Sequence, residues 1–258
     1  MKRNSVESSS ATVQSTSGKS AKLQFGYYKI PVSIAIDGLT LSIEKEKDRI
    51  VYNRTQFDKS IDKVILTETE KVLICPVEPV NIPKKITHNF QIALEKPVII
   101  GPKKTKSILL TFPVELGVFV YENKIYKLLD VFSLVKNKYT LYGDPKTGTL
   151  CRYWQSPIHS TIPPVDPIRE GVLQLTIRNT GHDWTEVTNS VFNAFGMKIY
   201  YNNQLVAMLA EMEIKNGKLA ETDFFNKPLR KDMYKAIELY SGKMVHIGSV
   251  KFVMEEGI

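Results

Sequence analysis

The segment VSIAIDGLTLSI, residues 32–43, decides the fold class of this chain. Apolar residues alternate with small or polar ones on both sides of Asp37-Gly38. A period of two is the pattern of a half-buried strand, and Asp-Gly tolerates the positive φ values of a two-residue hairpin turn. This stretch therefore predicts a β-hairpin.

The same alternation recurs along the rest of the chain. Further short runs cover residues 61–66, 72–77, 90–94, 108–112, 118–121, 125–129, 173–177, 197–201, 206–214 and 219–224. Short strands separated by frequent turn residues are typical of β-sandwiches and barrels. We expect an all-β protein with two sandwich domains, immunoglobulin-like or jelly-roll-like.

The domain boundaries follow from strand counting and composition. Residues 1–21 are rich in Ser and Thr and lack apolar periodicity, which predicts a disordered tail. About ten strands fit before residue 131 and about eight after it, so we expect one sandwich over 22–130 and another over 131–258. A proline-rich segment at 155–171 is an alternative boundary, either a linker between domains or a loop that crosses between sheets.

One segment has helical rather than strand periodicity. Leu229, Met233, Ile237 and Tyr240 recur at the spacing of an α-helix, after a proline and before a glycine. We therefore expect a helix over 228–241 that packs against the C-terminal sandwich.

Charge and cysteine content exclude several classes of protein. The 258 residues carry 35 Lys and Arg against 27 Asp and Glu, a net charge of +8, which is compatible with an acidic partner such as nucleic acid or an anionic membrane face. The two cysteines, Cys75 and Cys151, exclude a disulfide framework and a cysteine-rich zinc site. They are either two buried thiols or one long-range disulfide. With neither a membrane span nor a signal peptide in the sequence, we expect a cytoplasmic protein.

Basic and aromatic residues interleave in residues 136–154 and form the main candidate site. Aromatic rings can stack on bases while cations hold phosphates, although Tyr and Trp are also favoured in strand cores. A basic turn at 101–107 could extend the same surface. The candidate residues for binding nucleic acid or a protein partner are Lys136, Lys138, Tyr139, Tyr142, Arg152, Tyr153, Trp154, Lys103 and Lys104.

Signs of catalytic chemistry are weak. Glu211 and Glu213 share a strand face, but we expect that face to run out into solvent. The four histidines lack metal-ligand spacing, so we expect no metal and no cofactor. A sugar- or phosphate-processing enzyme would need a cleft near these glutamates, Asp144 or His182.

Several longer strings resemble a known family. They are residues 139–154 (YTLYGDPKTGTLCRYW), 77–79 (VEP), 111–115 (TFPVE), 196–201 (GMKIYY) and 235–240 (KAIELY). From about Phe25 to its end, the chain resembles an uncharacterised, mainly archaeal family, a domain of unknown function. The resemblance implies an archaeal cytoplasmic protein and no transferable catalytic residue.

Three functions therefore remain open. We expect first a non-catalytic β-sandwich module that binds a protein partner. The alternatives are an RNA- or ribosome-associated protein that uses the basic and aromatic surface, and an enzyme with an unrecognised site.

Overall fold

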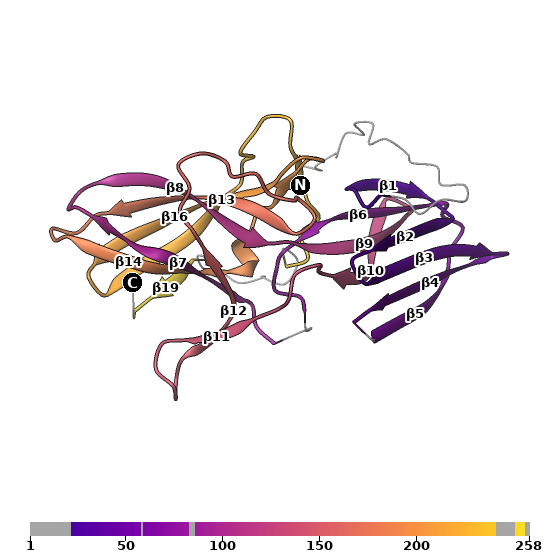
Figure 1. Cartoon of the computed structure of the whole chain (residues 1–258), viewed down its shortest axis with the longest axis horizontal. Helices are drawn as coiled ribbons and strands as arrows, with labels where there is room; N and C mark the ends of the chain where they lie inside the picture. Colours follow the sequence, from indigo (N-terminus) through magenta and orange to yellow (C-terminus); the bar gives the residue numbers. More distant parts are fainter. Residues whose placement is uncertain (1–21, 58, 83–85, 241–250, 256–258) are drawn as a thin grey trace. The chain divides into compact units, whose positions relative to one another are not determined.

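The computed structural model describes residues 22–57, 59–82, 86–240 and 251–255 (Figure 1). Within these residues strands predominate, and the helical structure is a single 3-10 turn, η1, at Ala194–Gly196. The predicted all-β class is confirmed. The expected tail at 1–21 lies outside the described residues.

Ten strands occupy the described chain as far as Phe132. They are β1 (Gly26–Lys29), β2 (Val32–Ile36), β3 (Leu39–Glu46), β4 (Arg49–Gln56), β5 (Lys59–Leu66), β6 (Lys71–Val77), β7 (Asn89–Ile100), β8 (Thr105–Pro113), β9 (Glu115–Glu122) and β10 (Ile125–Phe132).

Nine further strands follow in the described residues. They are β11 (Tyr139–Tyr142), β12 (Thr149–Ser156), β13 (Glu170–Asn179), β14 (Thr185–Asn193), β15 (Tyr200–Tyr201), β16 (Val206–Asn216), β17 (Leu219–Phe225), β18 (Tyr234–Lys235) and β19 (Phe252–Met254).

The chain divides into two compact units that interleave in sequence. Unit 1 contains the described residues up to Cys75 together with Val118–Asp130, and unit 2 contains Pro76–Gly117 and Val131–Ile258. One division falls at 130/131, and residues 76–117 group with the later part of the chain. The reason is long-range pairing, because β7 pairs with β12 and β14 and β8 pairs with β13.

Unit 1 is built from two four-stranded sheets, ordered β1-β6-β9-β10 and β2-β3-β4-β5. The predicted hairpin at its start is confirmed, since β2 pairs with β3 and the turn residues Asp37 and Gly38 have φ values of 45° and 75°. Alternate residues of these strands are buried, including Ile34, Leu41 and Ile43. The period of two in the sequence therefore corresponds to one face of the sheet that lies in the core.

Unit 2 has two sheets, with β16 at the centre of the larger one. One sheet is ordered β11-β12-β7-β14, and the other β18-β15-β16-β13-β8, with β17 and β19 joined to it through β16. The two sheets face one another through side chains such as Phe192 of β14 and Phe224 of β17, whose ring centroids are 5.1 Å apart. The runs predicted at 206–214 and 219–224 are strands β16 and β17, which pair antiparallel, and β15, from the run at 197–201, pairs with β16.

The proline-rich segment connects the two sheets of unit 2, because it runs from β12 in the smaller sheet to β13 in the larger one. Of the two alternatives raised by its composition, the structure shows the loop that crosses between sheets. A bridge between His159 and Leu109 of β8 holds it in place.

The helix expected over 228–241 is wrong for the described residues 228–240, which contain turns and the short strand β18. Residue 241 lies outside the described residues. Strand β18 pairs with β15, and the Ala236 N–H donates to the Ile199 carbonyl. Met233 and Tyr240 are buried as the stripe predicted, but pairing with the sheet edge takes the backbone groups that a helix would use.

Candidate functional site

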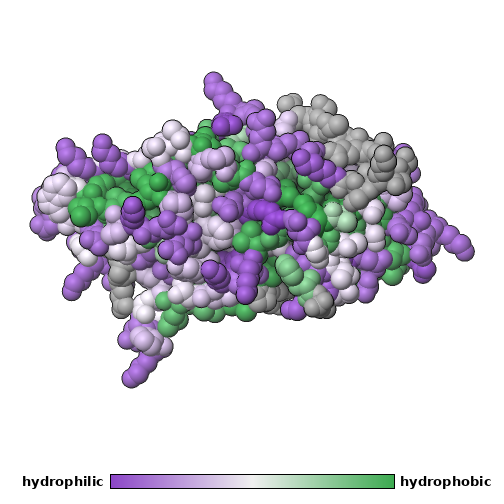
Figure 2. Space-filling model, viewed as in Figure 1, coloured by the Kyte–Doolittle hydropathy of each residue, from purple (hydrophilic) through white to green (hydrophobic). Residues whose placement is uncertain are grey.

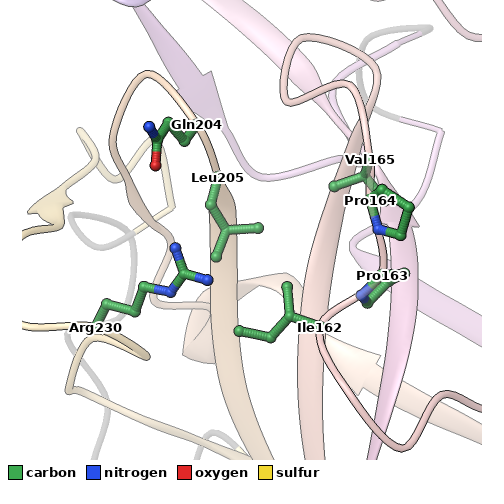
Figure 3. A pocket seen from close by; sticks show the side chains of 7 residues that line it. All are labelled: Ile162, Pro163, Pro164, Val165, Gln204, Leu205 and Arg230. Atoms are coloured by element: carbon green, nitrogen blue, oxygen red, sulfur yellow. The ribbon is translucent and has the colours of Figure 1, made fainter.

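A pocket of 320 Å³ opens on unit 2 beside the proline-rich loop. Its walls are Ile162, Pro163, Pro164 and Val165 from that loop, Gln204 and Leu205 from the turn before β16, and Arg230 from the segment before β18. Figure 3 shows Ile162 and Val165 pointing across the opening toward Leu205, with the Arg230 guanidinium directed at the same space. Five of the seven lining residues are apolar.

The floor of this pocket is part of the core. Leu205 is buried in a cluster with Val172, Tyr200, Ala207 and Met233, and the partly buried Ile162 and Val165 pack against that cluster. Consecutive prolines restrict the loop backbone, so the apolar wall is held in shape before any ligand arrives.

Hydrogen bonds hold the opposite wall. Asn202 Oδ1 accepts the backbone N–H groups of Gln204 and Leu205, each at 2.9 Å. The Asn202 amide donates to Asp232 at 2.7 Å, which joins this turn to the segment that carries Arg230. Hydrogen bonds therefore link the turn that carries Gln204 to the segment that carries Arg230, the two polar side chains of the pocket.

Arg230 is the charged group of the pocket. It is exposed, and within the described part of the chain its guanidinium makes no hydrogen bond or ion pair. A guanidinium presents five N–H donors in a plane that matches a carboxylate. The pocket thus combines an apolar hollow with one cation available for an anionic group.

The sequence-predicted site at 136–154 forms the β11–β12 hairpin, which Figure 1 shows at the lower edge of unit 2. Lys136 and Lys138 are exposed, as a binding surface needs. Tyr139 lies opposite Arg152, whose guanidinium carbon is 5.8 Å from the centroid of the tyrosine ring. The hairpin therefore brings part of the predicted set together.

Arg152, in contrast, is fully buried, with an exposed fraction of 0%. It donates to the Lys138 carbonyl at 3.3 Å, while its Nε and Nη2 have no partner among the described residues. Burial lowers the pKa of this guanidinium, and the negative charge of Glu115 acts in the opposite direction. In this structure Arg152 cannot contact a phosphate on the surface.

The aromatic rings of the hairpin are engaged in packing. Trp154 Nε1 donates to Thr111 Oγ1 at 3.0 Å, and the Tyr139 hydroxyl donates to the Ile82 carbonyl. Tyr142 packs edge-to-face against Phe252 with centroids 5.9 Å apart, and Tyr153 is half-buried in β12. These contacts are packing interactions, the alternative to ligand binding that the strand preference of Tyr and Trp had raised.

Lys103 and Lys104 lie in the β7–β8 turn, away from the hairpin. The hairpin pairs with the start of β7 through Arg152 and Phe90, whereas the turn follows Ile100 at its other end. Ten residues of strand separate Phe90 from Ile100, which at the rise of a β-strand is roughly 30 Å. The two groups of basic residues therefore do not form one surface.

Sequence reasoning missed a pair of buried carboxyl groups. Glu78 accepts the backbone N–H groups of Leu239 and Tyr240 at 3.0 and 3.4 Å, and Glu115 accepts the Asn81 N–H at 2.9 Å. Burial raises the pKa of each of the two carboxyl groups to about 7. The available signal was an acid inside an apolar run, in two of the strings that carry the family resemblance.

The acids and histidine considered for catalysis do not line the pocket. Glu213 instead forms ion pairs with Arg178 at 3.0 Å and with Lys215 at 2.9 Å, and Glu211 is half-buried beside it on β16. Asp144 closes the β11–β12 turn, where its carboxylate accepts the Lys146 N–H. Among the residues that the structure describes, no three His, Cys, Asp or Glu side chains gather as metal ligands would.

The described residues contain no helix with the length and apolar character needed to cross a bilayer. Cys75 and Cys151 are both buried and form no disulfide, so the disulfide alternative is not present in this structure.

Comparison with protein families gives a match over most of the chain. Neither the curated proteins nor the solved structures yielded a significant similarity. A family model described as "Protein of unknown function (DUF432)" matches residues 24–255. That range covers the described parts of both units, and it agrees with the resemblance read from the quoted strings. The chain therefore belongs to the DUF432 family.

Proposed function

We propose that this protein is a non-catalytic interaction module whose pocket receives an apolar side chain and a neighbouring carboxylate of a protein partner. The observation that carries the proposal is Arg230, an exposed cation with no described partner at the rim of an apolar hollow. Recognition sites combine a mostly apolar lining with a few polar groups that fix orientation.

The composition of the lining favours binding over reaction. None of the seven residues is an acid, a histidine, a lysine, a cysteine or a serine, which are the usual nucleophiles and proton carriers. Arg230 and Gln204 can orient a ligand through hydrogen bonds. We also propose a cytoplasmic location, which two buried cysteines without a disulfide, Cys75 and Cys151, support.

RNA binding, the alternative function, has less support. The exposed lysines Lys136 and Lys138 favour it, but the rings beside them are engaged in contacts within unit 2. Bases need an uncovered ring face for stacking.

The proposal is tested with a matched pair of small probes, N-acetyl-leucine and N-acetyl-leucinamide, which differ in the carboxylate. The full chain is titrated with each, and amide chemical shifts are followed by NMR. We expect N-acetyl-leucine to shift the resonances of Ile162, Val165, Leu205 and Arg230, with a Kd of roughly 1–10 mM for a ligand of this size. The amide probe should bind about threefold more weakly, because it lacks the ion pair.

Two variants separate the pocket from general charge. Arg230→Gln should reduce the affinity for N-acetyl-leucine to that for the amide probe. Lys231→Gln removes an adjacent exposed cation that does not line the pocket, and it should leave both affinities unchanged. Equal affinity for the two probes, or shifts confined to residues outside the pocket, would refute the proposal.

A further inference from the structure

One end of unit 2 exposes an indole and an aliphatic side chain together. Trp184 is 73% exposed and Ile99 is 64% exposed. Thr185 of β14 pairs with Ile100 of β7, and both are buried. The next pair, Glu186 with Ile99, therefore points outward, and Ile99 lies diagonally from Trp184 on the outer face. Diagonal neighbours on one face of a sheet are within reach of large side chains, so Trp184 and Ile99 can form one apolar surface.

The Trp184 ring is supported from below by a glycine. A Cβ atom placed on Gly101 would lie 3.3 Å from two carbons of the six-membered ring of Trp184. The ring edge thus rests on bare backbone, while most of the indole remains in solvent. A side chain at position 101 would require the ring to shift.

A buried amide holds the surrounding loops. Asn179, which is 1% exposed, donates to the Ile100 carbonyl at 3.2 Å and to the Asp183 carbonyl at 2.8 Å. Its Oδ1 accepts the Gly181 N–H at 2.9 Å, and its own backbone N–H donates to the Lys104 carbonyl at 2.9 Å. The β7–β8 turn and the β13–β14 loop are therefore fixed relative to one another, so Trp184 is presented on a rigid support.

The turns at this end of unit 2 carry exposed lysines. Lys103 and Lys104 are exposed in the β7–β8 turn, and the Lys103 ammonium group donates to the Thr180 carbonyl at 2.6 Å. The end of β16 lies beside the β13–β14 loop, where the Thr180 N–H donates to the Ile214 carbonyl at 2.9 Å, and the turn after β16 carries the exposed Lys218. Two acids, Asp183 and Glu186, share this end.

We call Ile99, Lys103, Lys104, Trp184 and Lys218 the tip of unit 2. Its three lysines, taken with Asp183 and Glu186 at the same end, give a net charge of +1. At the left end of the view in Figure 2, apolar surface lies between hydrophilic side chains. The tip thus joins an apolar centre to a basic rim.

We propose that the tip docks on an anionic phospholipid surface, with Trp184 and Ile99 entering the headgroup layer and the lysines contacting lipid phosphates. Tryptophan favours the membrane–water interface, because one part of the indole is apolar and its N–H can remain hydrogen-bonded. Lysines close to an anionic leaflet add attraction that decays within a Debye length.

A single-stranded nucleic acid fits the tip less well. Such ligands stack successive bases on several rings along a basic groove. Here the second apolar residue is the aliphatic Ile99, which has no aromatic face. A lipid surface uses an aliphatic side chain and an indole equally well.

The experiment uses Trp184 as its own reporter. The chain has two tryptophans, so Trp154→Phe leaves Trp184 as the only one. The variant is titrated with vesicles of phosphatidylcholine alone and with vesicles that also contain phosphatidylglycerol. We expect a blue shift of Trp184 emission only with the anionic vesicles, reversed by salt. Co-sedimentation of the wild-type chain is measured in parallel, so the result does not depend on the substitution.

Matched variants assign the contact. Trp184→Ala should abolish co-sedimentation, whereas Tyr234→Ala, at another exposed aromatic residue of unit 2, should leave it unchanged. Lys103→Gln with Lys104→Gln should lower the partition coefficient about 30-fold. Lys136→Gln with Lys138→Gln, at the β11–β12 hairpin, should have no such effect. Equal binding to neutral vesicles, no binding to either vesicle, or retention on an oligothymidylate in place of vesicles overturns the proposal.

Discussion

The carboxylate of Glu78, near the end of β6, accepts the backbone N–H of Leu239, a residue 161 positions later in the chain. The Tyr240 N–H donates to the same carboxylate. Burial raises the pKa of Tyr240 to about 12, and the negative charges of Glu78 and Glu115 add to the shift. One buried acid therefore joins Leu239 and Tyr240 to the end of β6, a strand in the first third of the chain.

This burial makes stability depend on pH. The pKa values of Glu78 and Glu115 are about 7 in the folded chain, against an ordinary value of 4.5. A raised pKa in the folded state means that the folded chain binds more protons, so stability is highest below about pH 4.5 and falls as pH rises to about 7. We expect urea unfolding of unit 2 to lose on the order of 2 kcal/mol for each carboxyl group between pH 5 and pH 7.5.

Glu78→Gln and Glu115→Gln test the assignment one group at a time. Each amide mimics the protonated carboxyl group, so each variant should lose its part of the pH dependence and should unfold at higher urea than the wild type at pH 7.5. A wild-type midpoint that does not change with pH over this range would show that the two groups titrate normally.

A second prediction concerns the core of unit 1. Arg54 Nε donates to Asp130 at 2.5 Å and the Tyr52 hydroxyl donates to the same carboxylate at 2.6 Å. Both members of the ion pair are buried. Asp130→Asn leaves the guanidinium without a counter-charge, so we expect the free energy of unfolding to fall by about 3 kcal/mol.

The matched control is an exposed pair in the same unit. Glu46 and Arg49 are 2.7 Å apart and about half-exposed, so Glu46→Gln should cost less than about 1 kcal/mol. Chemical denaturation measures the change in the free energy of unfolding for both variants. Similar costs for the buried and exposed pairs would contradict the argument.

A third prediction uses two glycines of unit 2. A Cβ atom on Gly171 would lie 2.3 Å from Cζ of the buried Phe112, its direct partner across β13 and β8. Gly171→Ala must displace that ring, and we expect a loss of about 2 kcal/mol in the free energy of unfolding. Gly217 has nothing within 4 Å of its Cβ position, so Gly217→Ala should change stability by less than about 0.5 kcal/mol.

A fourth prediction concerns the thiols. Burial raises the pKa of Cys151 to about 12, and Cys75 is also buried. Because the thiolate is the reactive form, the folded chain should react slowly with a thiol reagent at pH 8, and both thiols should titrate in denaturant without a reductant. Recovery of no thiols in denaturant before reduction would indicate a disulfide.

Local patterns in the sequence were enough to predict the strands. Alternation at 32–43 and the Asp37-Gly38 turn predict the β2–β3 hairpin, because both features depend on neighbours within a few residues. The same holds for the long strand at 206–214, whose apolar face is buried.

Other features depended on contacts between distant residues. The apolar stripe from Leu229 to Tyr240 has helical spacing, yet pairing of β18 with β15 gives this segment a partner that the stripe could not show. The position of residues 76–117 in unit 2 follows from pairing with strands that come later in the chain.

The binding surfaces show the same division. Local periodicity and composition are enough to predict the strand content, the main turns and the supply of basic and aromatic residues. It takes long-range folding to bury Arg152, to expose Trp184 beside Ile99 and to place Arg230 at an apolar pocket. Exposure is set by which strands pair across long separations, and no local pattern encodes that choice.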